Sequence, residues 1–102
     1  MPTIEEALIY LGYDVPDDVI TKNVTRQLAA AVKELQGAVG DDVDTLMPDD
    51  ERVHELVFIY LDDLHSNRGM SAKVSGAVRR SVQTLELQLT MELRRLREEA
   101  GA

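Results

Sequence analysis

The sequence predicts an all-α domain, a small bundle of about four helices, and three observations favour this fold class. Apolar residues make up 44% of the 102 residues and aromatic residues only 4%, so the core must be aliphatic. Leu, Ala, Glu, Gln and Arg, which favour helix, are frequent in the segments between clusters of turn residues. Apolar residues recur along these segments with the spacing of one helix face. We expect a single domain over residues 1–102, with a frayed C-terminus.

Capping residues predict the first two helices. Thr3 and Glu6 have the spacing of a capping box, and Gly12 is suited to end the short helix that follows. A second helix is expected to begin with the acidic residues at Asp17 and to end between Gly37 and Gly40. Its apolar residues have helical spacing and are Ile20, Val24, Leu28, Ala31, Val32 and Leu35.

Residues 41–51 form an acidic segment, which we expect to begin as a loop and to cap the next helix near its end. Its acids are Asp41, Asp42, Asp44, Asp49, Asp50 and Glu51, of which Asp49 or Asp50 is the expected cap. An EF-hand loop counted from Asp42 would need an acid or amide at the fifth position and Gly at the sixth. Leu46 and Met47 occupy these positions. The segment is therefore interpreted as a solvated acidic surface.

The third helix is predicted over residues 50–67 and should be the central and most buried one. Apolar residues cover one side and then extend nearly all round the helix; they are Val53, Leu56, Val57, Phe58, Ile59, Tyr60, Leu61 and Leu64. Asn67, Arg68 and Gly69 are turn residues that would close it. Residues 70–76 contain two Ser and a Gly, which leaves loop and helix both open.

The fourth helix is predicted over residues 77–98, although the stretch from Leu85 to Leu93 alternates apolar and polar residues as a strand does. Helix formers build almost all of that stretch, so helix is favoured. At about 100° per residue, one face then carries Val78, Val82, Leu85, Leu89, Leu93 and Leu96. Leu87 and Met91 point to nearly the opposite side. A helix that is apolar on two sides must be covered on two sides.

Leu87 and Met91 are our candidates for a contact between subunits, and Thr84 extends their row. The alternatives are that the helix is covered on both sides by its own monomer, or that two exposed apolar residues have no consequence. Arginines at both ends of this row are candidate rim charges of the contact; they are Arg79, Arg80, Arg94 and Arg95. Their alternative is a solvated helix with i, i+4 pairs such as Arg95 with Glu99.

Neither an enzyme nor a cofactor is predicted. The chain has no Cys, and its glycines are not followed by the Gly-Lys-Ser/Thr of a phosphate loop. His54 and His65 are eleven positions apart on one predicted helix, about 16 Å, so they cannot share a metal ion. The net charge of −8 argues against binding nucleic acid through its phosphates.

The order of segments resembles the head-to-tail connector, or adaptor, family of long-tailed double-stranded DNA phages and prophages. The resemblance covers nearly the whole chain and is strongest from Tyr60 to Arg95. The matching pieces are Ile4-Glu5-Glu6-Ala7, Asp17-Asp18, Ala29-Ala30-Ala31, Val57-Phe58-Ile59-Tyr60, Asn67-Arg68-Gly69, Ser75-Gly76-Ala77-Val78-Arg79-Arg80, Leu85-Glu86-Leu87-Gln88-Leu89 and Met91-Glu92-Leu93-Arg94-Arg95.

The resemblance implies a structural virion protein at the head–tail junction, assembled in the host cytoplasm. Such connectors form a homo-oligomeric ring of about a dozen subunits beneath the portal protein, through contacts that are heterologous and close on themselves. The ring prolongs the DNA channel without binding DNA specifically, and a head-completion or tail protein docks onto it. Phe58, Leu87 and Met91 with the four arginines become subunit or portal interface candidates, and the acids of residues 41–51 become candidates for the channel surface. The alternative is a small DNA-packaging or regulatory protein that binds DNA through the arginines of the C-terminal helix.

Overall fold

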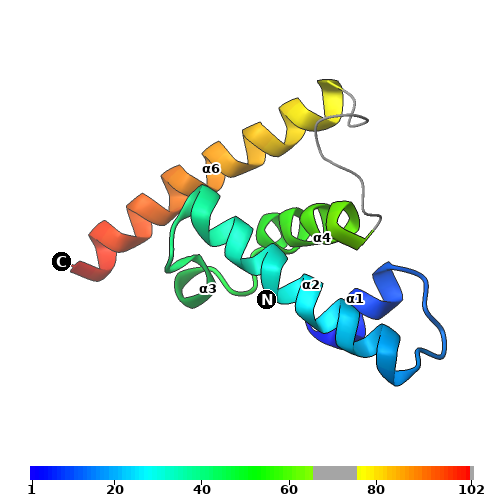
Figure 1. Cartoon of the computed structure of the whole chain (residues 1–102). Coiled ribbons are helices and arrows are strands. Elements are labelled where there is room, and N and C mark those ends of the chain that lie inside the picture. Colours follow the sequence, from blue (N-terminus) through cyan, green and yellow to red (C-terminus); the bar gives the residue numbers. More distant parts are fainter. Residues whose placement is uncertain (66–75, 102) are drawn as a thin grey trace.

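The computed structural model describes residues 1–65 and 76–101, and all regular structure in that part of the chain is α-helical. In chain order the helices are α1 (Ile4–Tyr10), α2 (Asp18–Val39), α3 (Val43–Leu46), α4 (Glu51–His65) and α6 (Gly76–Gly101) (Figure 1). The all-α prediction is therefore confirmed, with five helices described where about four were expected. The predicted turn at residues 67–69 lies outside the described residues, as does most of the 70–76 segment.

The predicted caps form at the start of α1 and α2. The Thr3 hydroxyl accepts a hydrogen bond from the Glu6 amide at 3.1 Å, and the Glu6 carboxylate accepts one from the Thr3 amide at 3.0 Å. Gly12 follows α1 with φ of +90°, in the left-handed region that suits Gly. At the next helix, the Asp17 carboxylate accepts from the Ile20 amide at 2.8 Å. Local polar chemistry thus places both helix starts where the sequence predicted them.

The acidic segment differs from its prediction, because the one-turn helix α3 forms where a loop was expected. Val43 is fully buried, and Met47 just beyond α3 is buried as well. These apolar side chains pack into the core, and α3 contacts both α2 and α6. Burial therefore outweighs the acidic composition over this turn. The Asp50 carboxylate then accepts from the Arg52 amide at 2.9 Å, which confirms Asp50 as the cap of α4.

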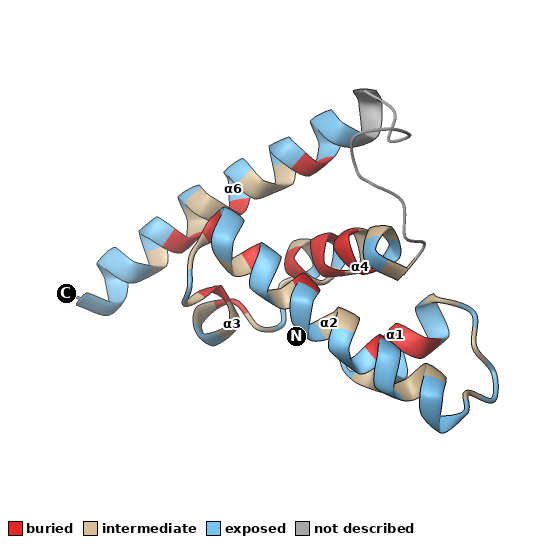
Figure 2. Cartoon of the chain, viewed as in Figure 1, coloured by how far each residue is buried: buried red, intermediate tan, exposed pale blue. Residues whose placement is uncertain are grey.

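One aliphatic core joins the helices. α2 and α4 make the most extensive contact, α1 packs on α2, and α6 lies across both α2 and α4. Figure 2 shows the buried residues of α6 on its side toward these helices and exposed residues on its other side. The buried apolar residues are Ala7, Leu8, Val24, Ala31, Leu35, Val39, Val43, Met47, Val53, Leu56, Val57, Tyr60, Leu61, Val82, Leu89 and Leu93.

Polar contacts at two points fix the rotation of α6 about its own axis. The Tyr60 hydroxyl of α4 donates to Oε1 of Glu86 at 3.0 Å. Near the C-terminal end, Nε of Arg97 donates to both carboxylate oxygens of Asp42, at 3.0 and 2.9 Å. These bonds add to the packing of Leu89 and Leu93, which are fully buried and hold one side of α6 in the core.

Candidate interaction surface

The side of α6 that faces away from the core carries two large apolar residues. Leu87 is 61% exposed and Met91 is 63% exposed, whereas Leu89 between them is fully buried. This confirms that α6 has a core side and a second apolar side. It also excludes the alternative that the described part of the monomer covers α6 on both sides.

Leu87 and Met91 belong to a row that begins and ends with arginine. At about 100° per residue, the directions of these five side chains differ by no more than about 40° from one line along the helix. We call the row the outer stripe; it consists of Arg80, Thr84, Leu87, Met91 and Arg94, all of them exposed. An apolar centre with charged ends has the layout of a protein–protein interface, in which the core is apolar and the rim is polar.

The remaining basic candidates on α6 differ in their surroundings. Arg95 donates to Glu92 on one side and to Glu99 on the other, so the predicted pair with Glu99 is confirmed. The hydrogen bonds from Arg95 lower the pKa of the Glu92 carboxyl. Arg79 is exposed and lies off the line of the outer stripe. Arg95 is therefore engaged within its own helix.

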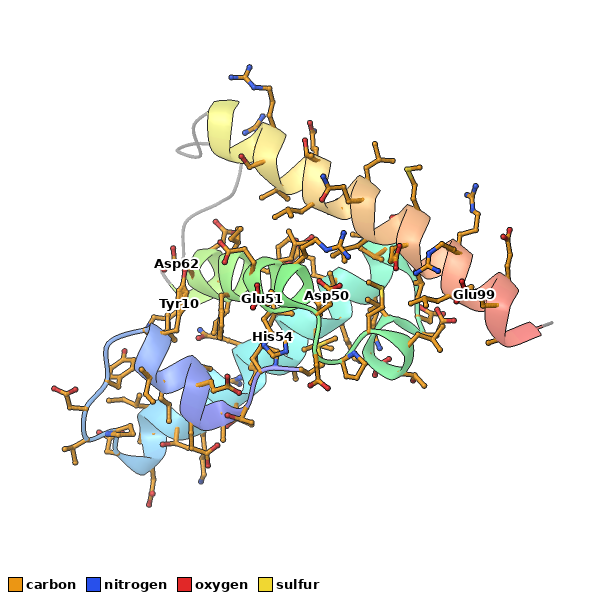
Figure 3. The ribbon with its side chains drawn as sticks, turned by 180° about the vertical axis from the view of Figure 1, so that it is seen from behind. Tyr10, Asp50, Glu51, His54, Asp62 and Glu99 are labelled. Carbon is orange, nitrogen blue, oxygen red and sulfur yellow. The ribbon has the colours of Figure 1, made fainter. Side chains whose placement is uncertain are left out.

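Among the described residues, two of the six acids of residues 41–51 have cation partners. Asp42 pairs with Arg97, and the hydrogen bonds from this guanidinium lower the pKa of the Asp42 carboxyl. Asp50 pairs with Arg52, whose Nε and Nη2 donate at 3.0 and 2.8 Å, and these bonds lower the pKa of Asp50. The other four acids are exposed or half-buried: Asp41, Asp44, Asp49 and Glu51. Figure 3 shows Asp50 and Glu51 at the start of α4 and Glu99 near the end of α6.

Phe58 lies on α4 and is half-buried, so the structure does not bring it onto the outer stripe. Its ring packs edge-on against the ring of Tyr10, with 4.6 Å between centroids and 71° between planes. Burial raises the pKa of the Tyr10 hydroxyl, and the negative charge of Asp62 adds to this effect. Figure 3 shows Tyr10 and Asp62 at the same end of the molecule. Phe58 thus belongs with the end formed by α1.

A second exposed apolar group, which the sequence reasoning missed, lies at that end. Ile9, Val15 and Val19 are 75%, 92% and 67% exposed, on the last turns of α1, the connection and the first turn of α2. We call this group, together with the exposed acids Asp14, Asp17 and Asp18, the N-terminal tip. In the sequence, such residues can be found as apolar residues that lie outside the helically spaced set facing the core. Val19, for example, directly precedes the row that starts at Ile20.

A polar cluster joins α2, α4 and α6 below the outer stripe. Burial raises the pKa of the Tyr60 hydroxyl, and so do the negative charge of Glu86 and the hydrogen bond to it. Burial also raises the pKa of the Glu34 carboxyl, with further contributions from the charges of Asp63 and Glu86. The named groups of this cluster are all acids, and they include no histidine or other base.

Both histidines make hydrogen bonds within the fold. His65 lies between the Tyr13 hydroxyl and Oε1 of Gln27, at 2.9 Å from each, and its ring packs edge-on against Tyr13. Nε2 of His54 lies 2.9 Å from the Pro48 carbonyl oxygen. Each ring therefore helps to hold loops and helices together. Within residues 1–65 and 76–101, no three side chains of metal-ligating type converge.

No protein family, curated protein or solved structure matches the chain. Among the described helices, none is both long enough and apolar enough to cross a membrane. The outer stripe and the N-terminal tip are therefore the features from which a function can be argued.

Proposed function

We propose that this protein is a structural, non-catalytic subunit of a ring, in which another protein molecule covers the outer stripe of α6. The single observation that carries the proposal is the exposure of Leu87 and Met91 on a helix whose other side completes the core. The specific form of the proposal is a phage head-to-tail connector. Its ring would sit beneath a portal protein at the head–tail junction of the virion and extend the DNA channel.

The physical argument for an assembly is the position of the exposed apolar residues. Covering apolar surface stabilises by about 25 cal/mol per Å², and scattered single residues supply little of it. Leu87 and Met91 instead lie one turn apart on the longest helix of the described chain. The polar contacts of Tyr60 and Arg97 hold that helix in one rotation, so the stripe is presented without a rearrangement. A fixed surface loses less conformational entropy on binding than a mobile one.

The charge distribution supports a channel role for the acidic segment. Asp41, Asp49 and Glu51 are exposed, and the chain as a whole carries −8. A surface of this sign would repel phosphates and let DNA pass without binding. Arg97 and Arg95 of α6 are paired with acids of the same chain, which makes them poor anchors for DNA. A portal protein and a head-completion or tail protein would then be the further partners.

The proposal is tested by measuring mass in solution for the wild type and for Leu87→Asp/Met91→Asp, by light scattering after gel filtration over a range of concentrations. We expect the wild type to form oligomers and the double variant to remain monomeric, because two carboxylates cannot be buried unpaired in an apolar contact. Both positions are exposed in the monomer, so circular dichroism should show an unchanged helix content.

The matched control is Thr25→Asp/Ala29→Asp, which adds the same two charges at the same spacing on exposed positions of α2. This variant should assemble as the wild type does. A wild type that is monomeric at every concentration, alone and with a phage portal protein added, would contradict the proposal. Equal assembly of both double variants would also contradict it.

A further inference from the structure

We propose that the N-terminal tip of one copy covers the outer stripe of α6 in the next copy. This inference rests on the proposed function, because it specifies which two surfaces of the chain meet in the ring. The occupant of the outer stripe is thus a second copy, bound through the connection between α1 and α2.

The molecule carries two separate apolar surfaces. Ile9, Val15 and Val19 lie on α1, the start of α2 and their connection, whereas Leu87 and Met91 lie on α6. Figure 1 shows the connection between α1 and α2 at one end of the elongated molecule and the C-terminal half of α6 toward the other. A ring needs two different surfaces on each subunit, so that each copy binds one neighbour on each side. The two apolar surfaces meet this requirement.

The segments that contain the two surfaces carry opposite charge. Residues 3–20 carry five acids and no Lys or Arg; the acids are Glu5, Glu6, Asp14, Asp17 and Asp18. Residues 79–97 carry five arginines and two glutamates, a net charge of 5 − 2 = +3, in a chain with a net charge of −8. A segment of net positive charge therefore contains the outer stripe, with Arg80 and Arg94 at its two ends, and an acidic segment contains the tip. Opposite charges around two apolar patches favour their association and reject pairs of like charge.

A contact between two outer stripes would leave the N-terminal tip uncovered. Two outer stripes packed on one another would cover Leu87 and Met91 but leave the tip exposed, including Val15 at the most exposed large apolar position. Such a contact also stops at two copies, because it uses the same surface on both. Packing the tip on the stripe uses a different surface on each copy, so the contact continues from copy to copy.

Cysteine cross-linking tests the pairing, since the chain contains no Cys of its own. Val19→Cys and Met91→Cys are made as separate proteins of different tag length, mixed and oxidised. A disulfide between the two differently tagged proteins can only join two separate copies. We expect this mixed product to exceed by several-fold the product of Met91→Cys with Thr25→Cys, an exposed position of α2 outside the tip. Higher salt should reduce it, because opposite surface charges are screened.

A second pair, Val15→Cys with Leu87→Cys, is tested in the same way, because one pair of side chains can be misaligned within a correct interface. The inference is overturned if neither pair exceeds the Thr25→Cys control. If Met91→Cys then links mainly to itself and the wild type is oligomeric, two α6 helices cover each other's outer stripes. In that case the claim that another molecule covers the stripe stands, and this pairing fails. If the wild type is also monomeric with and without portal protein, the proposed function fails too.

Discussion

Gly40 has the most restricted surroundings of the described glycines. Its φ is +155°, and an added Cβ would lie 2.6 Å from Cδ2 of Leu93 and in contact with the Arg97 guanidinium. Only a residue without a side chain lets the end of α2 approach α6 this closely. Gly40 therefore helps to determine how α6 lies on the rest of the fold.

The substitution Gly40→Ala should destabilise the protein by about 1–3 kcal/mol, because it adds both backbone strain and a clash with Leu93. Gly37→Ala is the matched control: Gly37 lies within α2, and nothing surrounds its Cβ position within 4 Å. Ala favours helix over Gly, so this variant should be more stable by about 0.5–1 kcal/mol. Urea unfolding followed by circular dichroism measures both. A Gly40→Ala protein as stable as the wild type would show that α6 can shift freely.

At the scale of elements, the charges of Asp63 on α4 and Glu86 on α6 act on Glu34 of α2. Burial and the charges of Asp63 and Glu86 raise the pKa of Glu34, so the folded state favours its protonated form. A raised pKa contributes stability that is present below the unfolded value of about 4.5 and lost as the pH rises through the folded pKa. Glu34 therefore opposes folding at neutral pH.

Glu34→Gln should raise the free energy of unfolding at pH 7, by about 0.5 kcal/mol after allowance for solvent screening at this largely exposed group. The gain should shrink as the pH falls below 4.5, where the wild-type carboxyl is protonated in both states. Urea titrations from pH 4 to pH 7 measure the difference in free energy of unfolding between the variant and the wild type. Glu55→Gln, an exposed position of α4, serves as the control and should show no comparable gain. If Glu34→Gln raises the free energy of unfolding equally at pH 4 and pH 7, the proposed charge effect is ruled out.

The helices differ in how far the sequence predicts them. In α6, Glu86, Leu87 and Gln88 alternate like a strand, yet helix propensity predicted both the element and its buried face. Caps at Thr3 and Asp17 were predictable because their partners lie three residues away. α3 was not predictable, since four residues contain too little periodicity and its burial depends on contacts with α2 and α6.

At the scale of the whole molecule, the sequence predicted one half of the candidate site. The outer stripe could be predicted because periodicity along one helix shows which residues cannot face the core. The N-terminal tip could not, since Ile9, Val15 and Val19 lie on α1, the connection and α2, and their exposure depends on how these elements pack. The pairing of Asp42 with Arg97 likewise joins residues 55 positions apart. Surfaces built from several elements are therefore the part that required the structure.

The central claim is that the N-terminal tip of each copy binds the outer stripe of the next copy. The most direct measurement places Val19→Cys and Met91→Cys in one chain, oxidises the assembled protein and counts the products by mass. The account predicts a ladder of covalent oligomers that rises by one chain at each step and disappears on reduction. Products that stop at the dimer, or a chain that remains monomeric under oxidation, would contradict it.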